Sequence, residues 1–321
     1  LGFIVYLIVF LTRRSSDLSL LLWILLTVGG DASLTALCHA MAIMATSGIS
    51  PVGGLTGEGS GMAGEAVMLL FMLFALSRLT FSTDTVTSEA GGLVRDPEFR
   101  IGIALVLAVP VVLFVRHFLG AVDVNAQDDL ADAGRALWGS AFTVLSFLTT
   151  TGFASANWAD AQAWSGLETP GLLLMGLALV GGGVATTAGG VKLLRVLALY
   201  LNGLREMERL VNPSSVSGAG SMGRRLQKDG AFIAWIFFML FAITLALISI
   251  LLSAAGVPFD TALVIAVSGL STTGPLLEVA ASEPIRLIEL SGAAKAIFVA
   301  AMVLGRRETL AIIALFTPDL W

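Results

Sequence analysis

Long runs of apolar residues without a single charge constrain this chain more than any other feature. Such runs cover residues 66–77, 101–115, 171–191 and 231–257. A helix needs about 20 apolar residues to cross the hydrocarbon core of a bilayer, and several of these runs approach that length. Only 13% of the residues are charged, whereas soluble domains carry about 25%. The sequence therefore predicts an all-α polytopic membrane protein.

Three 13-residue segments between the apolar runs share one form. They are ALCHAMAIMATSG (36–48), SAFTVLSFLTTTG (140–152) and ALVIAVSGLSTTG (262–274), and each ends in Thr-x-Gly. Each apolar stretch is too short to span a bilayer. Asp31 and Asp260 precede the first and third segments, where a carboxylate can cap the N-terminus of a short helix. The pattern predicts three short helices, each followed by a polar loop.

Such a helix–loop unit suits the passage of a cation. The C-terminal end of a helix carries partial negative charge, backbone carbonyls can replace the hydration shell of an ion, and glycine lets the backbone approach it. Three unrelated helix ends would also gather Ser, Thr and Gly, but three aligned segments between apolar runs favour pore loops. The expected filter residues are Thr46, Ser47, Gly48, Thr150, Thr151, Gly152, Thr272, Thr273 and Gly274.

The glycine-rich stretch GGGVATTAGGVK (181–192) interrupts an apolar run. A phosphate-binding loop requires Gly-x-x-x-x-Gly-Lys-Ser/Thr after a strand, and here Val191 separates Gly190 from Lys192. A further filter is excluded by spacing. Only 37 residues separate Gly152 from Gly189, too few at about 1.5 Å per residue for two membrane crossings and a pore helix. The remaining interpretation is a break in the exit helix. Such breaks line ion paths and act as gates.

The residues expected to form this gate are Gly181, Gly182, Gly183, Thr186, Thr187, Gly189 and Gly190. Two basic residues are candidate pore charges. Arg306 falls in the last apolar run, where an arginine faces a cavity or, alternatively, snorkels near the helix end and pairs with Glu308. Lys192 either pairs with the end of the broken helix or is an ordinary cytoplasmic lysine, which the sequence alone favours. His39 is expected to be a packed residue.

The distribution of Lys and Arg predicts the orientation. Seven of the 18 such residues lie between positions 192 and 228. The positive-inside rule places 83–100, 195–228 and the C-terminus in the cytoplasm, and 49–62, 153–169 and 275–290 outside. The sequence contains no nucleophile–base pair that would indicate an enzyme, and no cluster of His and Cys that would indicate a bound metal.

Several motifs together resemble one family. They are TTTGF (149–153), GGGVATTAGGVKLLR (181–195), RDPEFR (95–100), ERLVNPSSV (208–216) and the closing KAIFVAAMVLGRRETLAIIALFTPDLW (295–321). The chain resembles the TrkH/KtrB/HKT superfamily of potassium transport proteins, and its TrkH-like members above all. It departs from their pattern at Leu276, where TrkH proteins tend to have a second glycine, and at Ala185-Thr186-Thr187, where Gly-Ser-Thr is frequent.

The resemblance implies four helix–pore loop–helix units around one pore. On that plan, residues 1–94 hold the second unit, 95–228 the third unit with its cytoplasmic segment, and 229–321 the fourth. The broken exit helix of the third unit would cover 171–205. The chain starts at Leu1 inside an apolar run, and we expect the first unit to lie upstream of it. The resemblance also places Arg306 near the pore, below the filter.

Potassium uptake through a carbonyl-lined filter is the function that the resemblance implies. The alternative is a sodium-permeable protein or an ion-coupled secondary carrier of another polytopic class. The family further implies a homodimer in the bacterial cytoplasmic (inner) membrane, with a cytosolic nucleotide-binding regulatory subunit of TrkA type on the side of the 192–228 segment. We expect no bound cofactor or metal beyond permeating K+, possible permeation of Na+, no nucleic-acid partner and a cytoplasmic C-terminus.

Overall fold

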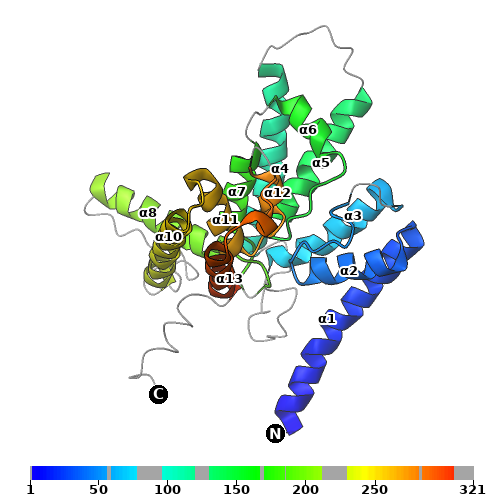
Figure 1. Ribbon diagram of the computed structural model, residues 1–321, viewed down its shortest axis with the longest axis horizontal. Coiled ribbons are helices and arrows are strands. Elements are labelled where there is room, and N and C mark those ends of the chain that lie inside the picture. The colour runs from blue at the N-terminus through cyan, green and yellow to red at the C-terminus, as the bar shows by residue number, and fades with distance from the viewer. Residues whose placement is uncertain are drawn as a thin grey trace.

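The computed structural model describes residues 2–55, 59–77, 96–119, 130–166, 170–184, 186–211, 230–281 and 284–306. Within these ranges every regular element is a helix, as the sequence predicts (Figure 1). By length and composition, Pro97–Arg116 and Ala231–Ala254 can each cross a membrane, and a third span results if the bent pair Trp158–Ser165 and Pro170–Val180 counts as one. The fold is therefore that of an all-α polytopic membrane protein.

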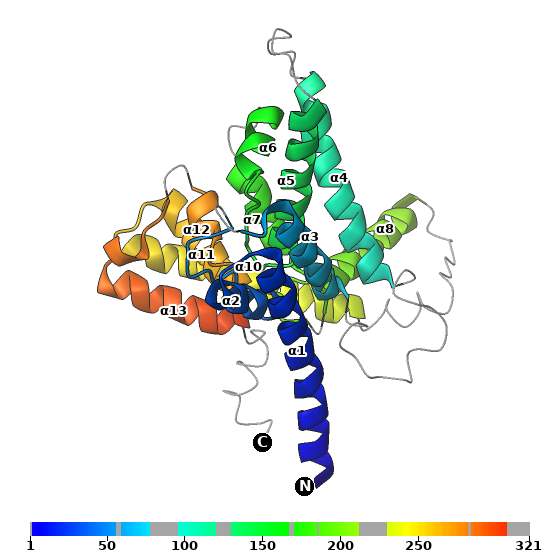
Figure 2. The same cartoon turned by 90° about the vertical axis from the view of Figure 1, so that its right-hand side faces the viewer.

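Helices α1 (Gly2–Gly29), α2 (Ser33–Met44) and α3 (Gly61–Met72) pack together as one group. A short 3-10 turn, η1 (Leu73–Leu76), extends α3. The charged stretch at 13–17 leaves open whether residues 1–30 form one helix or two, and the structure has one. In Figure 2 this helix extends below the rest of the molecule.

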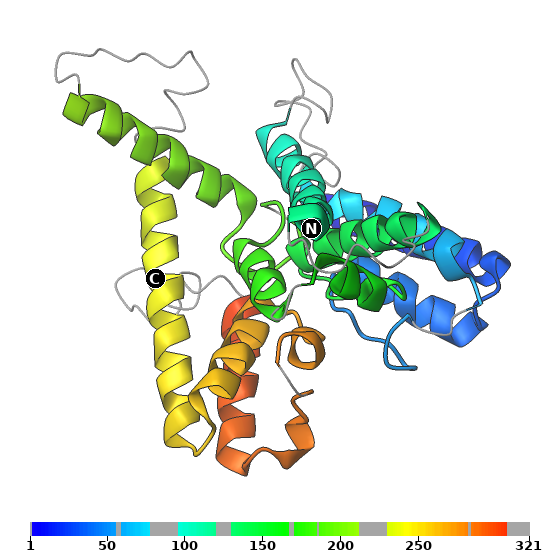
Figure 3. The same ribbon diagram turned by 90° about the horizontal axis from the view of Figure 1, so that it is seen from above.

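The second group comprises α4 (Pro97–Leu119), α5 (Leu130–Leu148), α6 (Trp158–Ser165), α7 (Pro170–Val180) and α8 (Leu193–Val211). Helix α5 has 19 residues, longer than the short helix expected before the 150–152 loop. Its first half carries an exposed Asp132–Arg135 ion pair at 3.3 Å, which spans one turn. Helix α8 projects to the side of the molecule (Figure 3).

The third group contains α10 (Ala231–Ala254), α11 (Phe259–Ser271), α12 (Leu276–Val279), η5 (Leu287–Glu289) and α13 (Gly292–Arg306). Helix α11 packs against both α10 and α13 and also reaches α7 of the second group. This contact joins the groups through a shared core.

The predicted carboxylate caps are wrong at both helices. Helix α2 is capped by Ala32 and helix α11 by Pro258, in each case without a side-chain hydrogen bond. The carboxylate of Asp31 is instead buried, and its Oδ1 accepts a 2.8 Å hydrogen bond from the Ser60 amide. The acid therefore ties the start of α2 to the start of α3.

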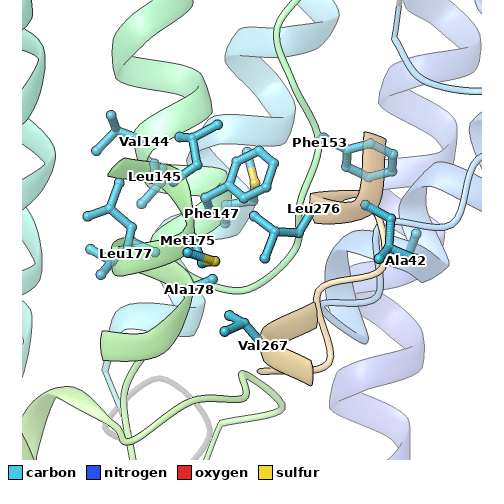
Figure 4. Packing of buried hydrophobic residues seen from close by; sticks show 14 of the residues in the cluster. Ala42, Val144, Leu145, Phe147, Phe153, Met175, Leu177, Ala178, Val267 and Leu276 are labelled. Carbon is cyan, nitrogen blue, oxygen red and sulfur yellow. The ribbon is translucent and has the colours of Figure 1, made fainter. Parts of the chain in front are cut away.

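A dry core lies where α5, α7 and α11 meet (Figure 4). Phe147, Ala178, Leu276 and Val267 are buried there, with at most 1% of each side chain exposed. Lipid tails are as apolar as these side chains, so close van der Waals packing holds the helices together in a bilayer. This core supports the ends of α5 and α11, from which two of the predicted filter loops emerge.

Candidate ion-conduction site

The three Thr-x-Gly loops meet at one place although they lie far apart in the sequence. A Cβ atom added to Gly48 would overlap the carbonyl oxygen of Thr151 and lie 2.8 Å from Cγ of Pro275. A Cβ atom added to Gly152 would lie 3.0 Å from both Cδ of Pro275 and Cγ2 of Thr273. The sequence-predicted filter residues are thus brought into one assembly.

The loops share one backbone geometry. Thr46, Thr150 and Thr272 have φ angles of 47°, 56° and 57°, and Lys192 is the one further non-glycine residue with a positive φ in the described ranges. The left-handed conformation costs a non-glycine residue about 1–2 kcal/mol. Three strained threonines at equivalent positions therefore indicate one repeated loop conformation, because unrelated loops would have such residues at different positions.

Hydrogen bonds at the helix ends are equally repeated. In each loop the second residue of Thr-x-Gly donates its amide to a carbonyl five residues back: Ser47 to Ala42 at 2.9 Å, Thr151 to Ser146 at 2.9 Å, and Thr273 to Ser268 at 3.0 Å. This bond ends helices in the Schellman motif, with threonine where glycine is usual. Each loop consequently leaves its helix in the same way, and the C-terminal ends of α2, α5 and α11 all lie at the assembly.

Gly274 differs from the other two filter glycines. It has no positive φ, and a Cβ atom there would meet nothing within 4 Å. The next residue, Pro275, supplies the contact with Gly48 and Gly152. The 272–274 loop therefore lies against its neighbours through Thr273 and through Pro275, a residue that the repeat pattern does not single out.

The glycine-rich segment interrupts a helix where the sequence predicts a break. Helix α7 ends at Val180 and α8 begins at Leu193. Backbone hydrogen bonds close the ends of the intervening loop, from Val191 to Leu179 and from Lys192 to Val180, both at 2.9 Å. We call residues 181–192 the gate segment.

The gate segment touches all three loops. The Thr46 hydroxyl donates to the Thr187 hydroxyl at 3.0 Å, and the Gly189 amide donates to the Thr150 hydroxyl at 2.7 Å. A Cβ atom at Gly189 would overlap the carbonyl oxygen of Ser271 and lie 2.8 Å from Oγ1 of Thr272. The segment therefore lies directly against the loop assembly.

Its remaining predicted residues shape the segment itself. Gly181 and Gly190 have φ angles of 73° and 77°, and Gly181 comes so close to the Gly189 carbonyl that a Cβ atom would overlap it. Gly182 faces Ala188, and the Thr186 hydroxyl donates to the Gly183 carbonyl at 2.7 Å. These contacts fold the segment back on itself.

Two neighbouring elements anchor the start of the gate segment. The Gly183 amide donates to the Ala75 carbonyl at 3.0 Å, and the Val184 amide donates to Oε1 of Glu98 at 3.0 Å. Glu98 is 1% exposed. It belongs to the first turn of α4, so the gate segment is bonded to both the second and the first group of helices.

The two predicted pore charges both contact the gate segment. The ammonium of Lys192 donates to the carbonyls of Ala188 at 2.5 Å and Thr186 at 3.3 Å, and only 7% of the residue is exposed. Lys192 is therefore a buried residue whose ammonium binds carbonyls of the gate segment, and its side of the membrane stays a prediction. The Arg306 guanidinium donates to the Thr187 carbonyl at 3.1 Å; Glu308, its suggested local partner, lies outside the described residues.

A cavity of about 340 Å³ lies on the gate side of the loops. Its lining includes Lys192, Arg195 and Arg306, besides gate residues and the apolar side chains Phe237 and Phe241. The Arg195 guanidinium stands 3.7 Å from the centre of the Phe237 ring, a cation–π contact. The cavity behind the gate segment thus presents three positive charges.

A second cavity, of about 170 Å³, lies on the other side of the loops. Gly48, Gly152 and Pro275 line it together with the carboxylate-bearing Glu278. The buried His39 stands behind this side: its Nε2 lies 2.9 Å from the Ser50 hydroxyl, and its ring meets Phe153 edge to face at 5.3 Å. His39 is a packed residue, as expected, and it supports two loops at once.

A wide groove of about 690 Å³ opens between the 46–48 and 272–274 loops. Its lining includes Ser47, Gly48, Gly274, Pro275 and, from α13, Phe298. None of residues 150–152 is among those that line this groove. The loop assembly is therefore open on one side in this chain.

Sequence reasoning missed three residues that the structure places at the site: Glu65, Glu98 and Pro275. A signal existed for Glu65, because an acid inside an apolar helix is costly and indicates a role. Glu98 stands in RDPEFR, whose Arg95 lies outside the described residues. Across the described ranges no group of three or more His, Cys, Asp or Glu side chains is placed to hold a metal ion.

Comparison with known proteins agrees with this architecture. The family model described as TrkH, cation transport protein, matches residues 66–320. The Trk system potassium uptake protein TrkH of Salmonella typhimurium is 28% identical over 310 residues, covering 94% of this chain and 61% of the relative. TrkH of Halomonas elongata is 31% identical over 290 residues, covering 89% of this chain and 56% of the relative.

The chain thus spans about three fifths of the length of the relatives that it matches. Among solved structures, the crystal structure of the potassium transporter TrkH from Vibrio parahaemolyticus superimposes with a TM-score of 0.75 at 23% identity, covering 95% of this chain and 63% of that one. That likeness concerns the fold. The family match covers most of the chain, and the chain therefore belongs to the TrkH family of cation transport proteins.

Proposed function

We propose that this chain takes part in potassium uptake across the bacterial cytoplasmic membrane. Ions would pass a filter lined by the carbonyls of the 46–48, 150–152 and 272–274 loops. One observation carries the proposal: three helices end in the same threonine-centred turn at one place. There, helix ends contribute partial negative charge, and backbone carbonyls can replace the hydration shell of the ion.

The gate segment would control passage from the inner side. It hydrogen-bonds to Thr46 and Thr150 and packs against Thr272, so an ion leaving the filter would meet it first. The segment carries the charge of Lys192, and the charge of Arg306 lies against it. A cation next to these charges is disfavoured by several kcal/mol wherever water is scarce, as estimated from Coulomb's law, so displacement of the gate segment would have to accompany conduction.

The groove between the 46–48 and 272–274 loops supports one further helix–loop–helix unit, the first on the four-unit plan, as the element that closes the ring. In the same proposal the protein is a homodimer and binds a cytosolic nucleotide-binding subunit of TrkA type. Support for a second component comes from the relatives, which are named as proteins of a Trk system. The basic 192–228 segment and the C-terminus would face the cytoplasm under the positive-inside rule.

A growth experiment tests the proposal. The complete gene product that contains this chain is expressed in a bacterial strain without potassium uptake systems, and growth is followed at low external potassium. We expect growth to be restored, together with uptake of Rb+ as a tracer. Membrane-inserted protein that restores neither growth nor Rb+ uptake would refute potassium transport as its function.

Two further measurements distinguish potassium-selective uptake from the alternatives, which are sodium permeation and transport coupled to another ion. Rb+ uptake is measured with excess Na+ and, separately, after the proton gradient is collapsed at a clamped membrane potential. Uptake that persists in both conditions supports a potassium-selective pathway. Strong inhibition by Na+ supports a sodium-permeable filter, and loss of uptake without the proton gradient supports a coupled carrier.

A further inference from the structure

Glu65 is a buried carboxylate that neither the filter nor the gate accounts for. It lies in the apolar helix α3, and 4% of the residue is exposed. An acid in such a place is costly unless hydrogen bonds satisfy it. Both of its oxygens are satisfied, and every partner belongs to the neighbouring group of helices.

Three donors converge on this carboxylate. Oε2 accepts from the indole of Trp138 at 2.7 Å and from the hydroxyl of Ser155 at 2.8 Å. Oε1 accepts from the amide of Ala156 at 2.7 Å. Hydrogen bonds to an ionised acceptor are about twice as strong as neutral ones. The carboxylate therefore binds the α5 helix and the chain that follows the 150–152 loop as one unit.

The chain after Gly152 is held on its other side as well. The Ser155 amide donates to the Thr143 hydroxyl at 3.1 Å, and the Ser155 hydroxyl accepts from the Asn157 amide at 3.1 Å. Gly139 lies so close to the Asn157 carbonyl that a Cβ atom there would overlap it. Residues 155–157 are consequently clamped between α5 and Glu65, three residues beyond the filter glycine.

Only an acceptor fits the position of Glu65. Glutamine has the same shape, but one end of its amide is a donor and would face the donors that now bind the carboxylate. The replacement leaves at least one buried donor unpaired, which is energetically unfavourable. The requirement for a carboxylate is therefore chemical as well as steric.

We propose that Glu65 is a positioning residue for the 150–152 filter loop and thereby sets how well the filter distinguishes K+ from Na+. Glu65 lies in α3, within the predicted second unit, and would position the filter loop of the predicted third unit. The inference rests on the proposed function, since it names a determinant of selectivity in that same filter. Release of the clamp would let the loop carbonyls move toward the smaller Na+ ion.

The test compares Glu65→Gln with Glu289→Gln, a neutralised exposed glutamate of η5, in the complete gene product. The ratio of Rb+ to Na+ uptake is measured per unit of membrane-inserted protein. We expect Glu65→Gln to lower this ratio about tenfold, equivalent to about 1.4 kcal/mol, and Glu289→Gln to leave it unchanged. An unaltered ratio in Glu65→Gln at normal uptake would overturn the inference.

Ser155→Ala keeps the test decisive if the Gln variant does not reach the membrane. It removes one of three donors without changing charge, and we expect a smaller loss of the ratio, about two- to threefold, in the same direction. Equal loss of Rb+ and Na+ uptake in Ser155→Ala would count against a role in selectivity. Absence of Rb+ uptake by the unaltered protein would instead refute the proposed function itself.

Discussion

The 150–152 and 272–274 loops carry the same Thr-Thr-Gly sequence in different surroundings. Thr150 and Thr151 are fully buried, and Gly152 is in tight contact with Pro275 and Thr273. Gly274 is exposed, and a Cβ atom added to it would meet nothing within 4 Å. The 150–152 loop has a neighbouring loop on each side, whereas the 272–274 loop borders the open groove. Identical motifs are thus subject to different constraints according to their place in the ring.

Alanine at the two glycines tests this difference with the largest expected effect. Gly152→Ala combines a φ of 89° with close contacts to Pro275, which together cost about 2–4 kcal/mol. We expect Rb+ uptake to fall about a hundredfold, by the usual conversion of free energy into rate. Gly274→Ala, the matched control, should retain at least half of the uptake. Similar losses in both variants would show that the two loops are equally constrained.

Valine at the two threonines asks whether the gate segment depends on both loops. Thr150→Val removes the acceptor of the Gly189 amide and leaves a buried donor unpaired, at a cost of about 1–3 kcal/mol. We expect the gate segment to loosen and the resting Rb+ leak in vesicles to rise about tenfold. The Thr272 hydroxyl has no hydrogen-bond partner among the described residues, so Thr272→Val should change the leak little. The reverse order would contradict the inferred attachment.

Glu98 offers a test of the gate segment away from the filter. Glu98→Ala removes the acceptor of the Val184 amide, and we expect the resting leak to rise about fivefold, because the start of the gate segment loses this hydrogen bond. Glu98→Gln keeps an acceptor oxygen of the same reach and should stay close to the unaltered protein. A leak that rises equally in both variants would indicate that the charge, rather than this hydrogen bond, matters.

The smallest effect on Rb+ uptake is expected from neutralising the exposed Glu278. Glu278 follows the 272–274 loop, is exposed, and lines the cavity of about 170 Å³ on the side of the loops away from the gate segment. Its charge should attract cations mainly at low ionic strength, because salt screens exposed charges over about 10 Å at 0.1 M. We expect Glu278→Gln to reduce the initial Rb+ uptake rate about twofold at low salt and not at high salt. A reduction that is independent of salt would place Glu278 in direct contact with the ion.

The helical fold and the positions of the loops could be predicted from local signals. Apolar run length and the repeated Thr-x-Gly are properties of short stretches, and the spacing between Gly152 and Gly189 excluded a further filter without any coordinates. The expected carboxylate caps were wrong for two different reasons. Asp260 lies inside the first turn of α11, which begins at Phe259, and for Asp31 a capping propensity does not reveal the competing partner. Asp31 bonds to Ser60, 29 residues away, and no local pattern encodes that pairing.

The supporting residues could not be predicted because their partners are distant in the sequence. Glu65 meets residues more than 70 positions away, and the gate segment meets Thr46 across 141 positions. The sequence alone also favoured a peripheral role for Lys192, since a lysine at the end of an apolar run usually faces the cytoplasm. Its two bonds to the gate segment exist only because that segment turns back on itself.

Pro275 has a consequence for how these proteins vary. Its ring contacts both Gly48 and Gly152, so the side chains tolerated at three positions from three separate loops depend on one another. A smaller residue at 275 would remove one of the contacts that a larger residue at 152 meets, but the φ of 89° at 152 would still strain that residue. Among family members, we therefore expect substitutions at these three positions to be correlated, although the positions lie far apart in the sequence.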